Sequence, residues 1–79
     1  MSVIPLRDYP AVRQDPLLAA LFEDLRDHLP LRSQVFVSER PDDPALRYRV
    51  WIRSSAGRLF GPHRPTLAQA IDGLIAKLR

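Results

Sequence analysis

The chain has 79 residues, 46% of them hydrophobic, and a formal net charge of +3. This length supports one small domain with a thin margin of stability, and the hydrophobic fraction is too high for a disordered chain. The absence of cysteine excludes disulfides, thiol nucleophiles and cysteine-based zinc sites. The longest apolar run, from Leu17 to Phe22, is far shorter than the roughly 20 residues that span a bilayer. Met1 to Leu6 lacks the pattern of a secretory signal, so we expect a cytoplasmic protein that does not enter a membrane.

Residues 1–14 are expected to form an extended N-terminal arm in front of a single domain over residues 15–79. Pro5, Pro10 and Pro16 support this expectation, because each proline biases the residue before it away from the helical conformation. The arm also carries apolar side chains that are suited to lie over a core. These are Val3, Ile4, Leu6, Tyr9 and Val12.

Two amphipathic helices are predicted. The first begins at Pro16 behind an Asp15 cap and stops at Pro30, and the second begins after Thr66, where Gln69 completes a capping box. Their apolar residues recur at the spacing of one helical face. In the first helix these are Leu17, Leu18, Leu21, Phe22, Leu25 and Leu29, and in the second Leu67, Ala70, Ile71, Leu74, Ile75 and Leu78. Gly73 weakens the second helix and indicates a close contact with the other helix or with a sheet.

Three strands are predicted between the helices, because runs of β-branched and aromatic residues alternate with turn residues. They cover residues 33–39, 46–53 and 58–61. The chain order is therefore α-β-β-β-α after the arm. Since each element has one apolar side, we expect an α+β fold in which a three-stranded antiparallel sheet carries both helices on one face.

The two hairpins differ in how firmly their registers are predicted. In the first hairpin we expect Val37 opposite Tyr48, which keeps both side chains in the core. The second hairpin has two registers. A three-residue loop closed by Gly57 turns Phe60 inward opposite Ile52, and a slip of one residue turns Phe60 outward beside Trp51.

Charge is distributed unevenly along the chain. Residues 1–31 hold three arginines and five carboxylates, a net charge of −2, whereas residues 32–64 hold seven arginines and three carboxylates, a net charge of +4. Arginine offers a planar donor fork and stacks on rings, which lysine does not. An arginine-rich middle segment therefore predicts an anionic partner, although a general preference for arginine in the genome explains the composition as well.

The strand at residues 46–53 places its arginines on one face. Leu46, Tyr48, Val50 and Ile52 alternate toward the helices, so the residues between them point away. The predicted binding face consists of Arg47, Arg49, Trp51 and Arg53, with Phe36 from the neighbouring strand and with Arg58 and Arg64 as secondary basic residues. The arginines would neutralise phosphates while the rings stack on bases. In the alternative interpretation this face is only solvated, with Glu39 and the turn aspartates balancing the arginines.

Signals for catalysis, metal binding or cofactor binding are weak. His28 and His63 are the only histidines, and the three glycines match no nucleotide-binding fingerprint. No serine lies in a nucleophile motif, and a sheet this small rarely holds a catalytic cleft. We therefore expect neither an enzyme nor a metal site, and no cofactor or small-molecule substrate.

The sequence leaves two functional hypotheses. The first is a non-catalytic binding module whose sheet face engages an anionic partner, most simply nucleic acid or else an acidic protein surface. The second is a small regulator or inhibitor of the kind encoded by phages and mobile elements, which binds and blocks a host protein complex. In that case the acidic helix surface of Glu23, Asp24 and Asp27 is an equally good contact surface. Open strand edges also favour a homodimer.

Two partial resemblances concern the order of elements. The α-β-β-β-α order is similar to that of a double-stranded-RNA-binding domain, which contacts RNA through lysines at the start of its last helix. This chain has Thr66-Leu67-Ala68-Gln69 there, which places RNA binding of that kind in doubt. Residues 48–71 resemble the three-strand-plus-helix modules of phage integrase arms, which lay their sheet in the DNA major groove. That likeness covers a hairpin and a helix start only, so we assign neither family.

Overall fold

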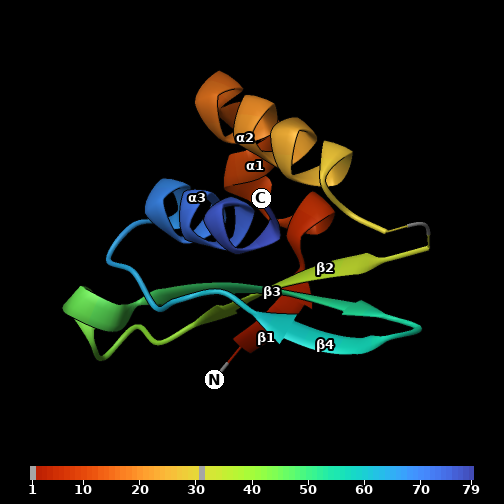
Figure 1. The fold of residues 1–79 in the computed structure, drawn as a ribbon. Helices are drawn as coiled ribbons and strands as arrows, with labels where there is room; N and C mark the ends of the chain where they lie inside the picture. Colours follow the sequence, from red (N-terminus) through yellow and green to blue (C-terminus); the bar gives the residue numbers. More distant parts are fainter. Residues whose placement is uncertain (1, 31) are drawn as a thin grey trace.

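A four-stranded antiparallel sheet carries the helices on one face in the computed structural model, which describes residues 2–30 and 32–79 (Figure 1). The strands follow one another in the sheet in chain order: β1 (Ser2–Pro5), β2 (Gln34–Glu39), β3 (Tyr48–Ser54) and β4 (Gly57–Phe60). The helices are α1 (Pro10–Gln14), α2 (Pro16–Asp27) and α3 (Leu67–Leu78), with 3-10 turns η1 (Leu6–Asp8) and η2 (Pro44–Leu46). The predicted α+β class, with two amphipathic helices on one face of an antiparallel sheet, is confirmed.

The N-terminal segment adds a strand, so the sheet has four strands and the expected number of three is wrong. β1 pairs with β2, with Ile4 opposite Val37. Beyond β1 the segment is helical, because Pro10 and Pro16 occupy the first turns of α1 and α2. Proline disfavours helix at the residue before it, here Tyr9 and Asp15, but its own fixed φ suits the first helical turn. Pro10 and Pro16 therefore start helices rather than keep the chain extended, whereas Pro5 lies in the extended strand β1 as expected.

The registers of the hairpins decide which side chains face outward. β2 and β3 pair with Val37 opposite Val50, so the predicted pairing with Tyr48 is wrong by two residues. A shift of two residues leaves every side chain on its predicted face, because the side chains of a strand alternate with period two. In the second hairpin Ser54 pairs with Gly57, which has φ 116°, and this register sets Phe60 opposite Trp51. The outward register of Phe60 is therefore the correct one.

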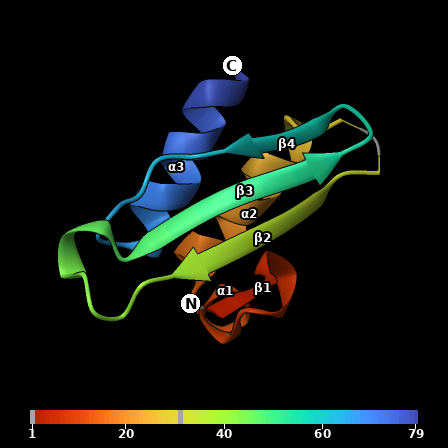
Figure 2. The same ribbon diagram turned by 90° about the horizontal axis from the view of Figure 1, so that it is seen from below.

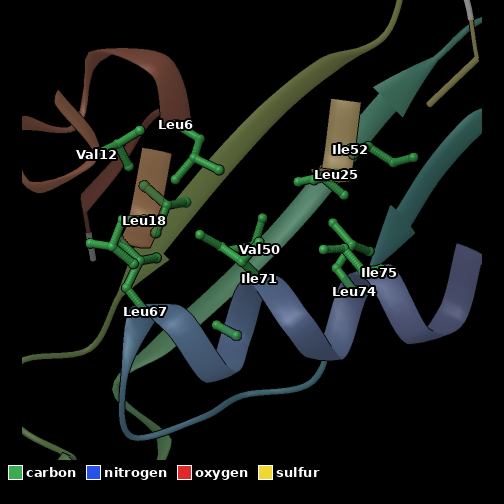
Figure 3. Close-up of a cluster of buried hydrophobic side chains, with 12 residues drawn as sticks. Leu6, Val12, Leu18, Leu25, Val50, Ile52, Leu67, Ile71, Leu74 and Ile75 are labelled. Carbon is green, nitrogen blue, oxygen red and sulfur yellow. The ribbon is translucent and has the colours of Figure 1, made fainter. Parts of the chain in front are cut away.

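The core lies between the sheet and the helices, with α3 at its centre (Figure 3). Side chains of α3 pack on Val50 and Ile52 of β3. α2 lies against α3 and adds Leu18 and Leu25 to the core. The N-terminal segment contributes the buried Leu6 and Val12. The buried residues of α3 are Leu67, Ala70, Ile71, Leu74 and Ile75, all of which were predicted.

Two leucines predicted to face the core are exposed instead. Leu17 is 61% exposed. It precedes Leu18 by one residue and therefore points to a different side of the helix from Leu18 and Leu25, which define the buried face. Leu46 is 42% exposed, because it belongs to η2 and precedes β3. The predicted caps of both long helices are confirmed. Asp15 Oδ1 accepts a hydrogen bond from the Leu17 amide at 2.9 Å, and Thr66 Oγ1 accepts one from the Gln69 amide at 3.2 Å.

Leu25→Ala should lower the free energy of unfolding by about 2–5 kcal/mol, because Leu25 is fully buried and its removal leaves a cavity. Leu17→Ala is the matched control on the same helix, and we expect a change within about 0.5 kcal/mol at this exposed position. Urea denaturation followed by circular dichroism measures both. Equal midpoints for the two variants would contradict the core described above.

Gly73 allows α3 to approach the segment that connects β4 to α3. A Cβ atom at Gly73 would lie 2.6 Å from Cγ and 3.0 Å from Cδ of Pro62. The predicted close contact at Gly73 is therefore real, but its partner is this connecting segment rather than the sheet or another helix.

Gly73→Ala should destabilise the protein by roughly 1–3 kcal/mol through this clash, although alanine stabilises an unhindered helix by about 1 kcal/mol over glycine. When Pro62 is already replaced by alanine, Gly73→Ala should lower the free energy of unfolding much less, because the ring that obstructs the new Cβ atom is absent. A double-mutant cycle of unfolding free energies tests this coupling. A Gly73→Ala variant that is more stable than the parent would show that no clash exists.

Candidate functional site

The sheet face opposite the helices, here called the outer face, is turned toward the viewer in Figure 2. Side-chain alternation and the strand registers define which strand positions point to it. These are Val3, Pro5, Gln34, Phe36, Ser38, Arg49, Trp51, Arg53, Arg58 and Phe60. Three of the ten positions are arginine, three are aromatic and none is acidic. The outer face therefore combines apolar rings with positive charge.

Three rings form a continuous stack across the outer face, here called the aromatic ladder: Phe36, Trp51 and Phe60. The centroids of Phe36 and Trp51 are 4.7 Å apart, and those of Trp51 and Phe60 are 5.2 Å apart. These distances lie in the range of favourable aromatic pairs. Trp51 Nε1 donates a hydrogen bond to Ser38 Oγ at 3.1 Å, which fixes the indole in its plane. The ladder is thus a pre-oriented set of half-buried rings from three adjacent strands.

Three arginines lie over the rings of the ladder. The guanidinium carbon of Arg49 is 4.3 Å from the centroid of Phe60, that of Arg53 is 5.5 Å from Phe36, and that of Arg58 is 5.7 Å from Trp51. Their hydrogen-bond acceptors are neutral. Arg49 Nε donates to the Gly61 carbonyl at 3.1 Å, and an Arg53 amino group donates to Gln34 Oε1. Within residues 2–30 and 32–79, no carboxylate pairs with these three guanidinium groups.

Arg53 and Arg58 stand directly opposite each other on β3 and β4. Like charges at directly opposed positions destabilise an antiparallel pair. This juxtaposition concentrates positive charge beside the aromatic ladder, which is what an anionic ligand would require.

Arg47 lies apart from the other predicted arginines. It precedes β3, and its Nε and Nη2 atoms donate to Glu39 Oε2 at 2.9 and 2.7 Å. Glu39 also accepts a hydrogen bond from the Tyr9 hydroxyl at 3.3 Å, beside α1. Burial, and after it hydrogen bonding with Tyr48, raises the pKa of Tyr9 above its ordinary value. Arg47 is therefore neutralised at the edge of the helical layer and does not add to the charge of the outer face.

The remaining predicted residues divide between the two sides of the molecule. Arg58 belongs to the outer face, whereas Arg64 is exposed at the opposite end of β3, where its backbone pairs with Tyr48. The acidic residues Glu23, Asp24 and Asp27 lie on α2, in the helical layer, on the other side of the sheet from the arginines of the outer face. The sequence did not place Phe60 in the site, because only the register of the second hairpin turns it outward.

Comparison with protein-family models, with curated proteins and with solved structures returned no match. Over the described part of the chain, no three His, Cys, Asp or Glu side chains are grouped so that they could hold a metal ion. No helix in the same residues is long and apolar enough to cross a membrane.

His63 lies at one end of the outer face, in the segment between β4 and α3. Its Nδ1 atom is buried and has no hydrogen-bond partner among the described residues. Burial, followed by the nearby charges of Arg40 and Arg49, lowers the pKa of His63. The ring is thus held neutral next to one of the three arginines of the site.

Acidification should weaken the fold through His63. Because its pKa is lower in the folded than in the unfolded state, the folded protein binds fewer protons, and stability falls as the pH drops below the unfolded value of about 6.5. His63→Gln should flatten the fall in unfolding free energy below that pH. NMR titration of the His63 ring should give a pKa below about 6.5. A measured pKa at or above that value would contradict this description.

Proposed function

We propose that this protein is a non-catalytic module that binds single-stranded nucleic acid on the outer face of its sheet. The observation that supports it is the aromatic ladder flanked by three arginines, none of which has a carboxylate partner within residues 2–30 and 32–79. Proteins that bind single strands without strong sequence preference combine these two features, rings for the bases and cations for the backbone.

The ladder favours unpaired bases as its ligand. The stacking faces of bases are covered inside a duplex, whereas a single strand can splay its bases onto protein rings. Four-stranded sheets with outward aromatic side chains are one recurrent platform for such binding. An acidic protein surface would satisfy the arginines, but it would make no use of three aligned rings. The combination therefore fits nucleic acid better than it fits an acidic protein.

The arginines prepare the face for both parts of the ligand. In the free protein each guanidinium rests over a ring, which shields the apolar surface from water. In the complex the guanidinium groups turn to the phosphates, and the bases take their place on the outward faces of Phe36 and Phe60, because these two rings cover the faces of Trp51. The stacking contribution and the phosphate contribution then come from different side chains, so substitution can separate them.

The test is binding of fluorescent single-stranded oligonucleotides, measured by anisotropy at several salt concentrations. Arg53→Ala and Arg58→Ala should each weaken binding and reduce the slope of log K against log salt by about 0.7, the value for one phosphate of a single strand. Arg79→Ala, on the helical layer, is the control that removes the same charge. We expect it to leave the affinity nearly unchanged.

Trp51→Ala should cost about 1–3 kcal/mol of binding with little change in the salt slope, because it removes the ring that holds Phe36 and Phe60 in place for stacking and removes no charge. Trp51→Phe should recover much of the affinity, and thermal melting verifies that both variants fold. The proposal fails if single strands do not bind at low salt. It fails equally if Arg53→Ala and Trp51→Ala bind as the parent does, or if duplex DNA binds as tightly and without dependence on Trp51.

A further inference from the structure

A cleft lies beside the outer face. This cleft, here called the α2–β2 cleft, has a volume of about 490 Å³ and is bounded by the C-terminal half of α2, the start of β2 and the chain from β1 into η1. Ligand pockets in proteins typically have volumes of roughly 300–1,000 Å³. The cleft is therefore large enough for a nucleotide.

Three arginines from different elements line the α2–β2 cleft: Arg7 of η1, Arg26 of α2 and Arg32 of the connection to β2. Among the described residues that line it, none is acidic. Arg32 has a φ of 63°, in the left-handed region that residues other than glycine rarely adopt. Strained backbone of this kind recurs at ligand sites. The cleft thus concentrates positive charge from separate parts of the chain.

The rest of the cleft offers an apolar wall. Phe22, Leu29 and Val35 line it, and the guanidinium carbon of Arg26 lies 5.9 Å from the Phe22 ring. An apolar wall beside a group of cations suits a ligand with a flat apolar part and an anionic part. Arginine forms bidentate bonds with phosphate and also stacks on planar groups, so a base with its phosphate fits both features.

The α2–β2 cleft and the aromatic ladder share a residue. Phe36 is the end of the ladder and also lines the cleft. β1 ends at Pro5, opposite Phe36, so Gln34 and Val35 of β2 have no partner in β1. The cleft therefore opens at the uncovered edge of β2, where a strand that leaves the ladder at Phe36 would pass.

We propose that the α2–β2 cleft binds the terminal nucleotide of the strand that crosses the ladder, a proposal that rests on the function given above. The base lies against the apolar wall of Phe22, Leu29 and Val35. The terminal phosphate lies among Arg7, Arg26 and Arg32. The site would make the protein selective for strand ends that carry a phosphate.

The first experiment compares three oligonucleotides of one sequence, with a phosphate at the 5′ end, at the 3′ end or at neither. One phosphorylated form should bind about tenfold more tightly than the form without a phosphate, the gain expected for a charge-assisted contact. Arg26→Ala and Arg32→Ala should abolish this preference. Arg64→Ala, which removes one exposed arginine at the far end of β3, should preserve it.

The second experiment isolates the cleft from the ladder. Adenosine 5′-monophosphate should shift the NMR signals of the Leu29 and Val35 methyl groups, whereas adenosine or inorganic phosphate alone should shift them much less. Shifts confined to the Trp51 indole would overturn the proposal.

The outcomes separate this proposal from the proposed function. If oligonucleotides bind but a terminal phosphate changes nothing, or if Arg26→Ala and Arg64→Ala behave alike, the cleft proposal is wrong and the proposed function stands. If oligonucleotides do not bind while the mononucleotide shifts Leu29 and Val35, the cleft is a nucleotide site and the outer-face proposal is wrong. Retention of the phosphate preference in Arg64→Ala and its loss in Arg26→Ala supports both proposals.

Discussion

The pairing of β2 with β3, in the register that sets Phe36 opposite Trp51, determines both faces of the sheet. On the inner face the same register aligns Val37 with Val50, and both are buried against the helices. A slip of one residue would turn these valines to solvent and bury the rings and arginines. The cost of burying unpaired guanidinium groups excludes that alternative. The hydrophobic core and the candidate site are therefore two consequences of one register.

Two features of the outer face reduce the stability of the fold. Arg53 opposite Arg58 is an unfavourable pair, and three rings kept partly in contact with water forgo burial in the core. Local contacts offset part of this cost, since each guanidinium covers a ring and Trp51 donates to the buried Ser38. These contacts hold the rings and cations in place, which under the proposed function would reduce the conformational entropy lost on binding.

Charge is separated between the two sides of the fold. The carboxylates Glu23, Asp24 and Asp27 lie on α2 in the helical layer, whereas the arginines of the outer face lie on the opposite side of the sheet. Arg47, one of the predicted arginines, is paired with Glu39 at the helical side. Under the proposed function, the arginines of the outer face would attract a polyanion to the sheet. The α2–β2 cleft extends the positive region around the edge of β2, through Phe36 and the three arginines that line it.

The periodicity of the sequence determined the two long helices, their caps and the inward face of β3, because these features depend on local spacing and on residues within one turn. It also placed Arg49, Trp51 and Arg53 on one face, since alternation along a strand is independent of its partner.

Tertiary structure decided the rest. β1 forms because Ile4 pairs with Val37, more than 30 residues away in the chain. The outward position of Phe60 follows from a two-residue loop between β3 and β4. Arg47 does not belong to the outer face, because it donates a hydrogen bond to Glu39 on the neighbouring strand. The cleft is formed by η1, α2 and β2, which are far apart in the sequence. The packing of the core brings these segments together. Their approach therefore leaves no periodic signal in the sequence.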